Sequence, residues 1–238
     1  MIEVPGKMLD WDTEFFGVRI ARIEGAHLTD ESIAQALQWS RDHQVACLYF
    51  LCASDDDRSV GIAEQNGFHL VDVRMELSWR AQAVTNDSLV EVRQFQSSDL
   101  PQLQEMASGA YKSTRFYYDR YFSRAKSSEL YREWVAKSCD GYADAVFVAP
   151  QQDTVGGFIT CQLETPRRGR IGLVGVNETA RGVGVGQALV KAAQRYFSDQ
   201  GVDEAFVVTQ GRNIAAQRLY QANGFRTHST HLWYHKWF

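Results

Sequence analysis

Arg181-Gly182-Val183-Gly184-Val185-Gly186 lies between an apolar run at 171–177 and a run typical of a helix at 187–197. A strand, a glycine-rich turn and a helix in this order present backbone N–H groups to a phosphate. Glycine at every second position lets the backbone approach a ligand closely, because no Cβ is in the way. The stretch therefore predicts a phosphate site, and the identity of its ligand decides the function.

The length and composition of the chain indicate a globular protein. It has 238 residues, 45% hydrophobic and 23% charged, which suffices for one large domain or two small ones. The net charge is −4 and no long lysine or arginine run occurs, which disfavours a nucleic-acid partner. No long apolar run and no signal-peptide pattern occurs, so we expect a cytoplasmic protein without membrane association.

The cysteines and an acidic run offer little sign of a metal site. The four cysteines lie in apolar contexts without paired zinc-type spacing, so we interpret them as small core residues: Cys47, Cys52, Cys139 and Cys161. The run Asp55–Asp57 is most simply a set of helix-capping residues. We therefore expect no metal.

A change of pattern at 81–89 divides the chain. Polar, turn-prone residues there predict a boundary between a domain at 1–85 and a domain at 86–238. In the second domain, hydrophobic periodicity predicts a mixed α/β layer architecture. We expect strands near 90–95, 145–149, 157–163, 171–177, 205–209 and 230–235, and helices from 97 and at 129–138, 187–197 and 213–222.

Residues 45–77 and 202–234 align without a gap at an offset of 157. Both copies have the pattern of a strand, a capped helix, an Asn-Gly-Phe turn and a second strand. The N-terminal copy lacks the glycine-rich turn and has Ala63 where the C-terminal copy has Tyr220. The alignment predicts a structural repeat whose first half keeps the scaffold without the chemistry.

Two common phosphate loops do not fit the glycine-rich turn. No Gly-x4-Gly-Lys-Ser/Thr pattern occurs, so no P-loop lysine is present. A dinucleotide fingerprint would need a third glycine at the position of Leu189, and its unit would stand early in the chain. By itself the turn could also be tight and glycine-rich without any ligand.

The residues that follow the turn favour one family. Arg181-x-x-Gly184-x-Gly186 resembles the acetyl-CoA loop of the GCN5-related N-acetyltransferases (GNAT), whose pattern is Gln/Arg-x-x-Gly-x-Gly/Ala. Asn213, Tyr220 and Gly224-Phe225 follow at the spacings of that family's Asn…Leu-Tyr-x-x-x-Gly-Phe signature. The resemblance covers 90–238. It implies a mixed α/β GNAT fold, preceded by a degenerate GNAT-like N-terminal half.

Three further segments suggest the acceptor. Trp11–Gly17, Ser113–Phe116 and Leu130–Trp134 resemble segments of family members that acetylate a nucleotide-linked amino sugar, dTDP-4-amino-4,6-dideoxygalactose. Nearly the whole chain is covered, although the N-terminal segment and the tail look longer here. Another small amine, a peptide or an antibiotic is an alternative acceptor. A CoA-binding module without turnover is an alternative function.

The family resemblance implies acetyl-CoA as cosubstrate. The turn would hold the pyrophosphate at a helix N-terminus, and the strand before it would pair with the pantetheine arm. Gly172 and Gly175 predict a bulge in that strand, which would free an amide for the thioester oxygen. The predicted cofactor-binding residues are Leu173, Val174, Val176, Arg181, Gly182, Val183, Gly184, Val185, Gly186, Asn213 and Tyr220.

Tyr220 is the predicted catalytic residue. Acetyl transfer from a thioester to an amine releases a thiolate, and a phenol with a pKa of about 10 can protonate it at pH 7. The resemblance assigns this role to the matching tyrosine. No base is evident: Glu164, His228 and His231 are candidates by residue type alone, and an amine that deprotonates in solvent needs none.

The loop Ser113–Tyr118 is the predicted acceptor site. Arg115 would bind a phosphate, and Phe116 and Tyr117 would contact a base or a sugar. An ordinary aromatic helix edge is the alternative.

Two further aromatic groups have structural interpretations. We expect Trp11, Phe15 and Phe16 in the core of the N-terminal half. The aromatic tail at 233–238 could be an edge strand that pairs across a homodimer, or it could be buried within the chain.

Overall fold

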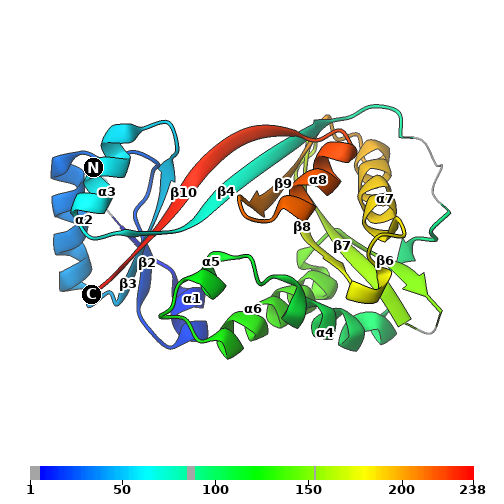
Figure 1. The fold of residues 1–238 in the computed structure, drawn as a ribbon, viewed down its shortest axis with the longest axis horizontal. Coiled ribbons are helices and arrows are strands. Elements are labelled where there is room, and N and C mark those ends of the chain that lie inside the picture. Colours follow the sequence, from blue (N-terminus) through cyan, green and yellow to red (C-terminus); the bar gives the residue numbers. More distant parts are fainter. Residues whose placement is uncertain (1–5, 85–88, 153) are drawn as a thin grey trace.

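A single mixed sheet organises the protein. The computed structural model describes residues 6–84, 89–152 and 154–238, and within them ten strands lie in the order β1-β2-β3-β10-β4-β9-β8-β7-β6-β5 (Figure 1). The strands are β1 (Lys7–Met8), β2 (Ile20–Arg22), β3 (Cys47–Ala53), β4 (His69–Arg80), β5 (Arg93–Gln94), β6 (Ala145–Gln151), β7 (Thr154–Thr165), β8 (Arg168–Val176), β9 (Glu204–Gln210) and β10 (Arg226–Trp237). Pairs β2/β3 and β8/β9 are parallel and the other pairs are antiparallel. The predicted mixed α/β class is confirmed.

Helices cover both faces of this sheet. They are α1 (Asp10–Phe16), α2 (Asp30–Asp42), α3 (Asp57–Gln65), α4 (Leu100–Ala110), α5 (Arg115–Tyr118), α6 (Arg124–Lys137), α7 (Val185–Asp199) and α8 (Ile214–Ala222). One short helix, α5, forms where the sequence predicted a loop. None of the helices in the described ranges is both long enough and apolar enough to cross a membrane.

The predicted repeat is present in the element bounds. Adding 157 to the bounds of β3, α3 and β4 gives the bounds of β9, α8 and β10. Asp56 caps α3 through the amide of Ser59, as Asn213 caps α8, so the predicted capping role of the acidic run is confirmed. Both helices end at a glycine of positive φ, +75° in Gly67 and +83° in Gly224. The two copies share one local backbone plan.

The copies exchange their last strands. β10 lies between β3 and β4, and β4 lies between β10 and β9, so the final strand of each copy pairs with the first strand of the other. In Figure 1, β4 and β10 cross the middle of the molecule side by side. The aromatic tail is therefore in the interior of the sheet, and the edge-strand alternative is wrong. The predicted boundary between residues 85 and 86 lies outside the described residues.

Three groups of buried side chains fill the layers. α7 and α8 pack on the C-terminal strands around Leu189 and Phe197, and α2 and α3 pack around Phe50. A third group joins α1 to α4 and α6. The predicted location of the N-terminal aromatics is corrected here, because they join this third group and stack across the two parts of the chain: Trp11, Phe15 and Phe16. The reason is that α1 packs against the rings of α5, α6 and the segment between them: Phe116, Phe122 and Trp134.

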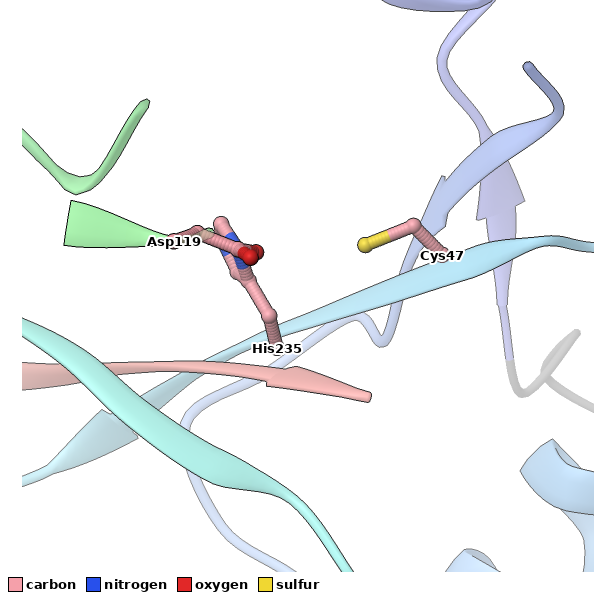
Figure 2. Close-up of side chains that lie close together, drawn as sticks. All are labelled: Cys47, Asp119 and His235. Atoms are coloured by element: carbon pink, nitrogen blue, oxygen red, sulfur yellow. The ribbon is translucent and has the colours of Figure 1, made fainter. Parts of the chain in front are cut away.

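A buried carboxylate ties the segment after α5 to the exchanged strand. Figure 2 shows Asp119 beside His235 of β10, with the thiol of Cys47 directed toward them. His235 Nδ1 and Trp237 Nε1 lie 2.7 and 2.8 Å from the same Asp119 oxygen, and the Tyr121 amide donates to the other oxygen. Burial lowers the pKa of His235 to about 4, so the neutral ring donates through Nδ1.

The same cluster could in principle hold a metal ion. One ligand atom from each of Cys47, Asp119 and His235 lies within 4.8 Å of the others. Hydrogen bonds already occupy both carboxylate oxygens, and burial raises the pKa of the Cys47 thiol. We therefore interpret the cluster as a structural lock, and the expected absence of a metal stays a prediction.

The hydrogen-bonded pair of Asp119 and His235 predicts that the free energy of unfolding falls in mild acid. An unfolded imidazole takes up a proton below its ordinary pKa near 6.5, whereas folded His235 stays neutral down to about pH 4. Stability should fall as the pH drops through this window, by about 2 kcal/mol between pH 7 and 5. His235→Asn keeps a donor for Asp119 without titrating, so urea unfolding at both pH values should show a shallower loss. Equal losses in the two proteins would contradict the assignment.

Candidate active site

A cavity of about 880 Å³ opens where β8 and β9 part. The two strands pair only from Arg168 to Ile171 and from Glu204 to Val207. Beyond this point β8 stays paired with β7 and β9 with β4, so each keeps one open edge. The residues of these open edges line the cavity: Gly172, Leu173, Val174, Val176, Val208, Thr209 and Gln210. An extended ligand can insert here and hydrogen-bond as an added strand does.

The predicted bulge in β8 is confirmed. Val174 lies opposite Ile159 while Ile171 lies opposite Cys161, so β8 carries one extra residue between them. The amide of Leu173 within the bulge donates to Thr160 Oγ1 at 2.8 Å. The bulge thus disturbs the ladder at the point where β8 leaves β9.

The glycine-rich turn forms the end of the cavity at the N-terminus of α7. Gly184 is the N-cap with φ +91°, and no side chain caps the helix. Among the described residues, no backbone carbonyl outside the helix accepts a hydrogen bond from the amides of Val185, Gly186 or Gln187. These N–H groups and the helix dipole are available to an anion. A Cβ on Gly186 would lie 3.2 Å from Leu219 of α8, so this glycine lets the helices approach.

The other predicted cofactor residues mostly meet at the same cavity. Arg181, Asn213 and Tyr220 all line it, as do the predicted turn glycines. Val183 is 61% exposed and is not among the lining residues. The side chain of Asn213 accepts from the Ala216 amide at 3.2 Å, so it caps α8 as the sequence predicted.

Tyr220 lies at the base of the cavity on α8, with 5% of its surface exposed. Burial raises the pKa of its phenol well above the ordinary value. Its hydroxyl makes no hydrogen bond with the described residues, and it is not one of the buried unpaired atoms, so it is open to the cavity. A protonated phenol with a free hydroxyl can donate a proton to a leaving group.

Of the three predicted acceptor residues, two reach the cavity. Arg115 and Phe116 line it, whereas the Tyr117 hydroxyl points to Ser128 and α6. The Arg115 guanidinium lies among the rings of Trp233, Phe116 and Tyr49, at 4.1, 4.4 and 5.0 Å from their centroids, and its Nε is buried without a partner. The arrangement holds a cation rigidly at the cavity wall.

Other lining residues were missed by the sequence analysis. They come from the C-cap of α4, from α6 and from the exchanged strands: Tyr111, Tyr131, Asp72, Arg74 and Trp233. Tyr111 stacks on Tyr131 at 4.3 Å, and its hydroxyl is buried without a partner. The sequence offered no distinct signal for Asp72, because polar residues alternate along β4 from Asp72 to Arg80. The base candidates named by residue type, Glu164, His228 and His231, do not line this cavity.

Comparisons with known proteins agree with this geometry. Residues 108–225 match the acetyltransferase (GNAT) family model. The dTDP-fucosamine acetyltransferase of Escherichia coli O6:H1 is 27% identical over 234 residues, which is 96% of each chain.

Two solved structures share the fold. One is a GCN5-related N-acetyltransferase from Sphaerobacter thermophilus, with a TM-score of 0.67 and 17% identity, covering 98% of this chain and 76% of that one. The other is a tandem GNAT protein from the clavulanic acid biosynthesis pathway, with a TM-score of 0.62 and 13% identity, covering 93% and 76%. With an open strand pair, an uncapped helix terminus and a buried phenol around one cavity, this chain contains a GNAT acetyltransferase domain and is an N-acetyltransferase.

Proposed function

We propose that this enzyme transfers the acetyl group of acetyl-CoA to the amino group of a nucleotide-linked amino sugar. The observation that carries the proposal is that one cavity joins the anion-binding end of α7, the open edges of β8 and β9, Tyr220 and the caged cation Arg115. The end of α7 suits a diphosphate, and the open strand edges suit an extended arm. Tyr220 suits a thioester, and Arg115 suits a second substrate that carries a phosphate.

Acetyl-CoA would lie across the gap between β8 and β9. Its pyrophosphate would accept from the amides of Val185, Gly186 and Gln187, where the helix dipole adds about 0.3–1 kcal/mol. The pantetheine amides would pair with the open strand edges. An amide freed by the β8 bulge, near Val174, would stabilise the thioester oxygen as it becomes negative, which is typically worth about 3–4 kcal/mol.

Tyr220 would act as the general acid. When the tetrahedral intermediate collapses, the C–S bond breaks and the CoA sulfur takes the phenolic proton. Burial raises the pKa of Tyr220, which keeps the phenol protonated before each turnover. Its open hydroxyl and its place in the last turn of α8, at the wall of the cavity, support this role.

A nucleotide-sugar acceptor is supported by two observations. The Escherichia coli relative that matches over 96% of the chain is named for dTDP-fucosamine. The guanidinium of Arg115 is held at the cavity wall by three rings, which suits a phosphate group. Phe116 lies beside it and offers a ring surface for the sugar or the base.

We also propose that residues 1–85 are a degenerate GNAT-like half and residues 86–238 the catalytic half. The equal element bounds at the offset of 157 support this origin. In the N-terminal copy, Ala63 stands at the position of Tyr220. A tandem GNAT protein is among the solved structures with this fold.

Gly186→Val should weaken CoA binding by about tenfold or more, because the branched side chain would push α8 away from α7. Gly61→Val is the matched control, since a Cβ on Gly61 of α3 meets nothing within 4 Å. Isothermal titration with CoA measures both. Equal affinities for CoA would argue against a cofactor site at this turn.

Tyr220→Phe should lower kcat by about 10²–10⁴, because the thiolate loses its proton donor. CoA affinity should stay unchanged, since the ring is retained. Tyr117→Phe is the control, because its hydroxyl faces Ser128. Steady-state thiol release measures the rates, and a full rate in the Tyr220 variant would exclude it as the acid.

The acceptor class is tested by thiol release with a panel of amines. We expect turnover with dTDP-linked 4-amino sugars and none with polyamines or lysine peptides. Arg115→Gln should raise the KM for the sugar by about 10- to 100-fold through loss of a charged hydrogen bond. The exposed Arg120→Gln in the same segment serves as control. Tight CoA binding without turnover of any amine would favour a non-catalytic module instead.

A further inference from the structure

One buried carboxylate in the cavity has no role in the proposal above. Asp72 is 4% exposed and lines the cavity from β4, a strand of the N-terminal repeat. In the sheet it lies opposite Trp233 of β10. Because β4 is inserted next to β9, a residue from the repeat without the glycine-rich turn reaches the cofactor cavity.

The surroundings of Asp72 place it beside the predicted acceptor residues. The amide of Val73 and Nη1 of Arg212 both donate to its Oδ1, at 2.9 and 3.3 Å. Charge from Arg212, and more weakly from Arg115, favours the ionised form. Tyr131 of α6 is near enough for the carboxylate to affect its phenol. Burial outweighs the two cations and raises the pKa of Asp72 to about 6.

Other acidic groups are less suited to meet an acceptor amine. Among the described residues that line the cavity, Glu178 also carries a carboxylate, but it is 82% exposed and pairs with Arg181 beside the glycine-rich turn. Glu76, four residues along β4, is tied to Arg74 and Arg170 and does not line the cavity. Asp72 thus combines burial, access to the cavity and a position near Arg115.

We propose that Asp72 is the general base that accepts the proton of the acceptor nitrogen. The proposal rests on the function proposed above. It gives the N-terminal half a part in the chemistry, because that half would supply the base while the C-terminal half supplies the acid.

The acceptor enters the cavity as the neutral amine. The nitrogen lone pair attacks the thioester carbon, a C–N bond forms and the carbonyl electrons move to oxygen. The carbonyl re-forms as the C–S bond breaks, and the sulfur takes the proton of Tyr220. The nitrogen gives its surplus proton to the Asp72 carboxylate. Asp72 then releases that proton to solvent and Tyr220 regains one, so the enzyme returns to its starting state.

The test compares Asp72→Asn with Glu76→Gln, a matched loss of one largely covered carboxylate on the same strand. With an acceptor that the wild type turns over, Asp72→Asn should lower kcat at pH 7 by about 10²–10⁴. Its CoA affinity should match that of the wild type, and Glu76→Gln should keep the wild-type rate. Asp72→Glu, which restores a carboxylate, should recover part of the loss, and circular dichroism reports whether each variant is folded.

The pH profile separates a base from a merely structural residue. Wild-type kcat should rise with pH through an acidic limb near pH 6, because only the ionised carboxylate accepts a proton. That limb should be absent in Asp72→Asn. An unchanged rate, or a lower rate with the limb intact, would overturn the proposal for Asp72. A wild type that acetylates no amine would instead overturn the proposed function itself.

Discussion

The pairing of β4 with β10 is the contact on which the rest of the molecule depends. These two twelve-residue strands lie antiparallel at the centre of the sheet and join the two copies of the repeat. Backbone hydrogen bonds of this kind are largely independent of side chains, so the two copies can diverge in sequence and stay joined. The same pairing carries Asp72 and Trp233 to the wall of the cavity.

The cavity itself results from strands that stop pairing. β8 and β9 are parallel neighbours for only four residues each, and the bulge in β8 coincides with their separation. An unpaired strand edge inside a protein is costly unless another group satisfies it. A ligand with amides along an extended arm meets that requirement, which links the shape of the sheet to the chemistry of the proposed cofactor.

Much of this arrangement could be predicted from local sequence. The strand, turn and helix around Arg181–Gly186, the capping by Asn213 and the repeat at offset 157 all depend on neighbouring residues. The exchange of strands could not be predicted, because it depends on which distant edges pair and no local pattern records that choice. The same limit explains why Asp72 was missed, since it is one of several polar residues that alternate along β4. It also explains the aromatic tail, whose alternation suits an edge strand and an interior strand equally well.

The position of β10 also bears on how the protein forms. Its residues 231–237 pair with β3 at residues 47–53, far earlier in the sequence. Until these residues are synthesised, β3 is paired with β2 on one edge while its other edge stays open. Contacts between such distant segments form slowly, and uncovered strand edges invite mispairing. The strand exchange means that neither copy of the repeat completes its part of the sheet without the other, so the two copies reach the native state as one unit.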